Sequence, residues 1–406
     1  MARGLFAVLE DELSEIIPAV TDEQAERVEE LEEQVAQGEV VEAEAEVQET
    51  GETVDEAIAA IEELSDVAEV LEGSVEEGEG LSEDAAEIAE VAVEAICNRL
   101  GYKPEKKVIP AMESFGGASS RMDATKYALE GVKETIMKIW EAIANFFKSM
   151  YEKIKGLWAQ LLSGAVRLQA RAKTIREKVS KAVASNLVAD KETKIEVSKY
   201  LVAFNSTSGS AVKQASLDTM VDLVKTLGEQ GKVNSELAGL LDEVVKSEQI
   251  TGVSEKLEGV IKKAVPGKLA FGYEFKTEDG KLSVVQNKVK VEKTETEAVS
   301  LGTLNTIATA AFNIGKAIQD GKENISKAES TIKKAISLAD KLGKSQTLSG
   351  ANASEAKAKA DVFRKAQTGI VLINSKVPSI ALKAGSVGLD FVSANLGAYK
   401  AAEAAK

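Results

Sequence analysis

The charge of this chain reverses once along its length, and the reversal limits how its two parts can fold. Up to Glu113 the sequence holds 34 Asp and Glu against 6 Lys and Arg, a net charge of −28. From Ser114 onward, 44 Lys and Arg outnumber 32 Asp and Glu, a net charge of +12. The overall charge of −16 therefore conceals two oppositely charged segments. Because the acidic segment repels itself, we expect it to be weakly folded when alone.

The junction between the two segments has the composition of an exposed linker. Residues 109–120 read Ile-Pro-Ala-Met-Glu-Ser-Phe-Gly-Gly-Ala-Ser-Ser. The proline disfavours helix at the residue before it, and the Gly-Gly-Ala-Ser-Ser run is too flexible and polar for a packed element. Segments of this kind are easy protease targets. The sequence therefore predicts that residues 1–113 are an acidic propeptide whose removal releases a basic mature protein.

Composition argues against most catalytic chemistry. The 406-residue chain has no histidine and one cysteine, Cys97, which excludes disulfide frameworks, Cys/His zinc sites and His-dependent triads. Among 66 carboxylates neighbouring pairs arise by chance, and the glycine clusters lack the flanking strand and Lys-Ser/Thr of phosphate-binding loops. We expect no enzyme, metal or cofactor.

The apolar run at the N-terminus, about five residues, is too short for a secretory signal, and no window approaches the ~18 apolar residues of a membrane span.

Helical periodicity dominates the chain, and aromatic residues make up only 4% of it. In residues 1–100 apolar side chains recur at spacings of three and four, which predicts amphipathic helices broken at Gly38, Gly51, Gly73 and residues 78–80. Two interpretations stay open for this acidic region. It is either a solvated or disordered tail, or an intramolecular polyanion that occupies the basic part until cleavage.

The clearest periodic segment lies between residues 123 and 187. Its apolar side chains form a heptad seam widened into a broad face, and both tryptophans lie on it. The face comprises Ile136, Trp140, Ile143, Phe147, Met150, Ile154, Leu157, Trp158 and Leu161. Such a helix either packs against other helices of this protein or its oligomer, or lies in a membrane interface.

A cluster of cations follows this face directly. It comprises Arg167, Arg171, Lys173, Arg176, Lys178 and Lys181, offset only by Glu177. Polyanion binding through counterion release is one function that such a cluster serves. A solvated helix face is the other interpretation, because no aromatic residues alternate with the cations to stack on bases.

The remaining sequence predicts a mixed region and then more helices. Residues 268–293 alternate on both sides of Asp279-Gly280, a strong signal for a β-hairpin. The segment from Gly385 to Ala405 is so rich in Ala and Gly that we expect only a peripheral helix or a flexible tail. We therefore predict a mainly α protein of amphipathic bundles with one small hairpin. Its regions are 1–113 (acidic propeptide), 114–190 (amphipathic and basic helices), 191–300 (mixed) and 301–406 (Ala/Ser/Lys-rich helices).

An acidic leader, an Ala-Met-Glu junction and a basic helical body together resemble the internal head proteins of large tailed bacteriophages, particularly the phiKZ-like giant phages. In that family a prohead protease cuts after Glu in Ser/Ala-x-Glu sequences. The resemblance implies cleavage at Ala111-Met112-Glu113, with Ser114 as the mature N-terminus. The same tripeptide pattern recurs at residues 60–62, 74–76, 85–87, 92–94, 128–130, 353–355 and 401–403, where we expect helix to protect the copies after residue 113.

The leading hypothesis is a virion structural protein packaged inside the head as a precursor and present in the host cytoplasm during assembly. Its expected partners are the prohead protease, capsid or scaffold proteins and packaged double-stranded DNA, with a homo-oligomer left open. Cleavage would let the body associate with the genome through phosphate attraction, and ejection with the DNA is one outcome. The rival is a membrane-active or pore-forming helical protein masked by its acidic segment, and a third alternative is an uncut helical scaffold.

Overall fold

The computed structural model describes residues 22–401, apart from 105, 207, 210, 248–251, 266–267, 279–280, 288–290 and 345–352. Helices build most of it. They are α2 (Asp22–Glu76), α3 (Glu83–Arg99), α4 (Ala118–Ala184), α5 (Ser198–Ala203), α6 (Val212–Ser247), α7 (Val253–Ala264), α8 (Leu301–Asp320), α9 (Asn324–Lys344), α10 (Ala353–Val371) and α11 (Val377–Leu396). Short turns of helix are η1 (Met112–Phe115), η2 (Ala270–Gly272), η3 (Gly321–Glu323) and the π-helical η5 (Leu372–Lys376). The mainly α prediction is confirmed.

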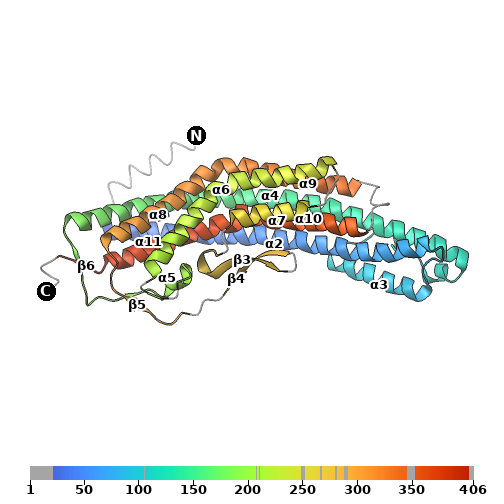
Figure 1. Cartoon of the computed structure of the whole chain (residues 1–406), viewed down its shortest axis with the longest axis horizontal. Coiled ribbons are helices and arrows are strands. Elements are labelled where there is room, and N and C mark those ends of the chain that lie inside the picture. Colours follow the sequence, from blue (N-terminus) through green and yellow to red (C-terminus); the bar gives the residue numbers. More distant parts are fainter. Residues whose placement is uncertain are drawn as a thin grey trace, which may run out of the picture.

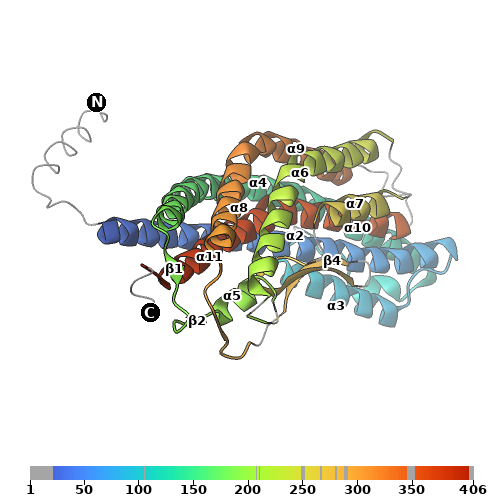
Figure 2. The same cartoon turned by 60° about the vertical axis from the view of Figure 1, so that its left-hand side comes forward.

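The two long helices α2 and α4 run side by side along the molecule, as Figure 1 shows. The 67 residues of α4 span about 100 Å at 1.5 Å per residue. The two helices are antiparallel, because Glu72 of α2 pairs with Lys133 of α4 whereas Lys153 of α4 donates to the carbonyl oxygen of Glu46. The helices α8, α9 and α11 also pack against α4, whereas α10 packs against α2, and α11 in turn packs against α8 and α6 (Figures 1 and 2).

The predicted breaks in the acidic region are wrong at three of the four positions. The helix α2 runs without interruption through Gly38, Gly51 and Gly73. A glycine inside a helix costs about 1 kcal/mol, which tertiary packing readily offsets. At Gly51 the absence of a side chain lets α10 approach closely, because a Cβ there would lie 2.5 Å from Nε2 of Gln367 in α10. The helix ends before residues 78–80, as predicted.

The apolar face of α2 is part of the hydrophobic core. Its fully buried side chains are Val47, Val54, Ile58, Ile61, Leu64 and Leu71, and they belong to the same cluster as the core residues of α4, α6, α8, α10 and α11. The acidic side chains occupy the other faces of the helix, where water weakens their mutual repulsion. In the described residues, therefore, the acidic segment is a packed layer of the bundle from Val40 onward.

The β structure consists of short antiparallel pairs. The predicted hairpin is present as β3 (Tyr273–Glu278) and β4 (Lys281–Gln286), which pair in register from Tyr273 with Gln286 to Glu278 with Lys281, and its Asp279-Gly280 turn lies outside the described residues. Further pairs join β1 (Val188–Ala189) to β6 (Tyr399–Lys400) and β2 (Ile195–Glu196) to β5 (Glu295–Thr296).

The expectation for the C-terminal segment is wrong, because α11 is a central core helix. Its glycines bring neighbouring helices into close contact: a Cβ at Gly385 would lie 2.7 Å from Cδ2 of Leu168 in α4, and one at Gly388 would lie 2.9 Å from Cε of Met220 in α6. Small residues therefore serve close packing here.

Within the described residues one helical stretch, Ala358–Leu396, is long and apolar enough to cross a membrane, and 78% of its apolar window is buried inside the protein. Such burial is typical of a core helix.

Candidate processing site

The predicted cleavage peptide lies at the end of the bundle where the chain passes from α3 to α4 (Figure 1). After α3, Gly101 adopts a left-handed φ of 64° and turns the chain back along the helices. Val108 and Ile109 are buried at 8% and 2% exposure. A Cβ at Gly131 of α4 would lie only 2.8 Å from the carbonyl oxygen of Val108. The loop is thus held against α4 by a close backbone approach that glycine permits.

The peptide itself forms the 3-10 turn η1. Ala111 and Glu113 are exposed, Met112 and Ser114 are half-buried, and the amide of Ser114 donates to the carbonyl oxygen of Ala111 at 2.9 Å. Phe115 is fully buried and anchors the turn to the core. The scissile bond predicted between Glu113 and Ser114 therefore lies on the surface. It lies between the buried residues Val108 and Ile109, which we call the strap, and the buried ring of Phe115.

The other copies of the Ser/Ala-x-Glu pattern have a different backbone. Those at residues 60–62 and 74–76 belong to α2, those at 85–87 and 92–94 to α3, and those at 128–130 and 353–355 to α4 and α10. The copy at 401–403 lies largely outside the described residues. Among the described copies, the one at 111–113 alone lies outside an α-helix. Local backbone structure thus separates it from sequences that share its pattern.

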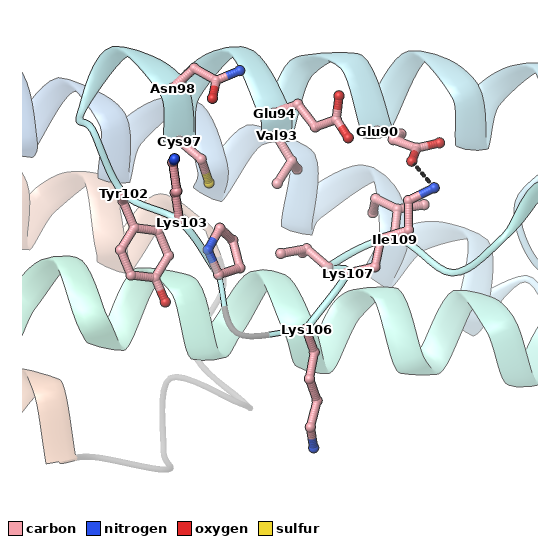
Figure 3. Close-up of a pocket in the computed structure, with 12 residues that line it drawn as sticks. Glu90, Val93, Glu94, Cys97, Asn98, Tyr102, Lys103, Lys106, Lys107 and Ile109 are labelled. Carbon is pink, nitrogen blue, oxygen red and sulfur yellow. Dashed lines mark ion pairs between the residues drawn. The ribbon is translucent and has the colours of Figure 1, made fainter.

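A pocket lies beside this loop, between α3 and residues 102–104 and 106–109 (Figure 3). On one side Lys107 and Glu90 form an ion pair across it. On the other side Cys97 points toward the loop, and burial together with the nearby charge of Glu94 raises the pKa of its thiol. A raised pKa lowers the fraction of reactive thiolate. No cluster of metal-ligating side chains occurs in the described residues. The pocket is therefore best described as the lining of the strap that precedes the cleavage peptide.

A family model for phiKZ-like phage internal head proteins matches residues 10–379 of the chain. The match covers most of the chain, both the acidic segment and the basic body. The chain belongs to this family. As an internal head protein it is a structural component of the virion and is packaged inside the capsid, with which it is associated. No curated protein and no solved structure matches the chain.

Ion pairs link the acidic segment of this internal head protein to its basic body. Glu62 makes a two-point pair with Arg364 of α10, with nitrogen–oxygen distances of 3.0 and 2.8 Å. Burial opposes the charge of Arg364, but the hydrogen bond and charge of Glu62 outweigh it, and the net effect raises the pKa of Arg364. Glu44 pairs with Lys376 at 2.5 Å, at 14% and 18% exposure. Together with the pair between Glu72 and Lys133 of α4, these contacts tie α2 to the body from Glu44 to Glu72.

The predicted nucleic-acid-binding cations do not form a single exposed surface. Arg171 is 5% exposed and pairs with Asp390 of α11 at 2.9 Å. Arg176 is half-buried, with its guanidinium over the ring of Phe312 at 5.8 Å. Arg167 and Lys178 are half-buried and have partners, and Lys173 and Lys181 are exposed. Arg171 faces α11, which packs against this part of α4 and supplies Asp390.

All nine side chains of the predicted apolar face lie in the interior, at 0–4% exposure. Trp140 and Phe147 pack against the ring of Phe363 from α10, at centroid distances of 4.8 and 6.1 Å. A helix in a membrane interface needs its apolar face exposed. In this folded state the face therefore serves helix packing and offers no surface to a membrane.

Sequence reasoning missed the basic partners of the acidic segment. Lys133, Arg364 and Lys376 lie far from the cluster at residues 167–181 that stands out in the sequence. Each pairs with an acid that is between 61 and 332 positions away in the chain. No local pattern signals such pairs, because they depend on how α2 lies across the body.

Proposed function

We propose that this internal head protein is made as a precursor and that a prohead protease cuts it after Glu113. The observation that carries the proposal is the backbone of Ala111-Met112-Glu113, a 3-10 turn at the surface where the charge reverses, whereas the other described copies lie in α-helices. A protease binds its substrate in extended form. A surface turn followed by exposed Gly116 and Gly117 opens at lower cost than a helix packed in the core.

The N-terminal sequence and intact mass of the protein from mature virions test this proposal. We expect the chain to begin at Ser114. In a phage carrying Glu113→Gln, the chain should stay uncut at this position. The matched control is Glu130→Gln, which alters the same tripeptide pattern inside α4 and should leave processing unchanged. Full-length protein in mature particles would refute the proposed maturation.

We further infer that the body, residues 114–406, contacts packaged double-stranded DNA through its phosphates. Its net charge of +12 favours this contact once the acidic segment, at −28, has left. Within the predicted cluster, the exposed Lys173 and Lys181 are the side chains best placed to reach phosphate without breaking an ion pair of the fold. Arg171 would first have to leave Asp390.

Salt-dependent DNA retention tests this inference. Each phosphate contact contributes about 0.9 to the slope of log K against log salt. The double variant Lys173→Gln with Lys181→Gln should therefore lower the slope of the isolated body by about 2. Lys322→Gln, a matched change in the turn η3, should leave it unaltered. A body whose DNA retention does not depend on salt would contradict the inference.

Assembly partners are proposed on the same basis. The acidic segment keeps the precursor at a net charge of −16, so that it stays off DNA while capsid or scaffold proteins assemble around it.

A second copy of the chain is a further proposed partner, and sedimentation of the precursor at several concentrations tests it. Ejection with the genome would follow if the phosphate contacts persist during DNA release, which labelled protein detected in infected cells would establish.

A further inference from the structure

The surface on which α2 rests is a seat for an amphipathic acidic helix, and it has two parts. Its centre receives apolar side chains of α2 that are completely buried, among them Val54, Ile58 and Ile61. Its rim carries cations from the body that pair with α2 acids, Lys133 on α4 and Arg364 and Lys376 at α10 and η5. The hairpin closes one side, where Gln48, Glu52 and Asp55 of α2 share a groove with Tyr273, Val284 and Val371.

We propose that cleavage after Glu113 does not release the acidic segment, and that α2 and α3 remain in this seat as a separate, non-covalently bound chain. The inference rests on the proposed function for its setting, since it concerns the product of that cut. Its physical basis does not depend on where the natural cut falls. The peptide at 111–113 lies at the end of the bundle, so cutting it breaks no contact between α2 and the body (Figure 1).

Apolar burial holds the segment more firmly than charge does. Each fully buried Val, Leu or Ile strengthens an interface by roughly tenfold or more, and α2 contributes Val47, Val54, Ile58, Ile61, Leu64 and Leu71 at 0% exposure. The ion pairs at the rim add orientation and are partly screened by salt. Bound in this way, the cut protein keeps its net charge of −16. The change to +12 then requires a second event, such as digestion of α2 and α3 after they unfold.

The test uses the full chain with the recognition sequence of a specific protease inserted between Gly116 and Gly117, so that it does not depend on the phage protease. After complete cutting, gel filtration is run in 0.15 M and in 1 M NaCl, and the fractions are analysed under denaturing conditions. We expect both fragments in one peak at both salt concentrations, and separation only in denaturant. We also expect the cut protein to bind DNA no better than the uncut protein. Two separate peaks in either salt would overturn the inference.

Matched isoleucine variants locate the interaction. Ile58 on α2 is fully buried and Ile88 on α3 is 72% exposed, and both belong to the cut fragment. Ile58→Ala should raise the dissociation constant of the cut complex by about 30-fold or more, whereas Ile88→Ala should change it by less than about threefold. Circular dichroism before cutting verifies that both variants fold. Equal dissociation constants for two folded variants would refute the seat as described.

If virions prove to lack any cut at Glu113, the proposed function fails while this measurement stands. If the cut is found and the inserted-site protein separates in buffer, the seat fails while the proposed function stands.

Discussion

Glu62 and Glu63 are consecutive acids on α2 that pair with different arginines, and the pairs differ in burial and in the number of hydrogen bonds. Glu62 meets Arg364 at 2.8 Å, with the side chains 30% and 11% exposed. Glu63 meets Arg99 of α3 at 2.9 Å, with both side chains 45% exposed. Substituting each acid in turn by glutamine therefore measures what burial and a second hydrogen bond together add to an ion pair of almost the same length.

The expected cost of Glu62→Gln follows from the group it leaves behind. Arginine stays protonated in proteins, so the variant keeps a nearly buried cation with a neutral partner. Removing one member of a buried pair costs about 3–5 kcal/mol. Because Glu62 is 30% exposed, water reaches the site, and we expect about 2–3 kcal/mol of lost stability. Glu63→Gln should cost about 0–1 kcal/mol, the range for exposed pairs.

Chemical denaturation of the full chain, followed by tryptophan fluorescence, measures both values, because Trp140 and Trp158 lie buried on α4. A second comparison isolates the unpaired charge. Glu62→Gln combined with Arg364→Met should be less destabilised than Glu62→Gln alone, since it removes the buried cation as well. Losses of stability that agree within about 0.5 kcal/mol for the two single variants would refute the reasoning, because water would then screen the Glu62–Arg364 pair as well as it screens an exposed pair.

Two further predictions concern the strap and the C-terminal strand. Gly131→Ala should push Val108 off α4 and speed limited proteolysis of residues 100–117. The overpacking costs about 1–3 kcal/mol, and the higher helix propensity of alanine offsets about 1 kcal/mol of that cost. The control Gly156→Ala, whose Cβ would have nothing within 4 Å, should not speed proteolysis. Hydrogen bonds, first from Lys400 and then from its own loop, lower the pKa of Asp190 from 3.8 to about 2. Its contribution to stability is therefore complete above pH 3.8 and lost as the pH falls through 2, so the stability difference from Asp190→Asn in acid titrations should shrink over that window. Unchanged proteolysis in the first case, or a difference independent of pH in the second, would contradict these assignments.

Much of the fold could be predicted because its signals are local. The seam from Ile136 to Leu161 repeats every three or four residues, and an α-helix places such residues on one side whatever surrounds it. Alternation around Asp279-Gly280 likewise predicted strands that the structure pairs in register. The glycines of α2 misled because glycine lowers helix propensity by only about 1 kcal/mol. Gly385 and Gly388 misled for the opposite reason, since their lack of a side chain is used for close packing.

The candidate site could be predicted only in part. The tripeptide ending at Glu113 is one of several copies, and the change of charge around it singled it out in the sequence. That the copy at 60–62 is helical and shielded depends on α2 packing along α4, which no single segment reveals. The cluster at residues 167–181 was visible as charge, but the burial of Arg171 against Asp390 depends on α11, more than 200 residues away.

By itself the sequence determined the helical periods, the hairpin and the separation of acids from bases, because each of these is a property of neighbouring residues. Tertiary structure alone decided that the apolar side of α2 is buried in the core and that Glu62 meets Arg364. Both depend on which surfaces come together when the chain collapses, and the burial that selects those surfaces is shared among residues hundreds of positions apart.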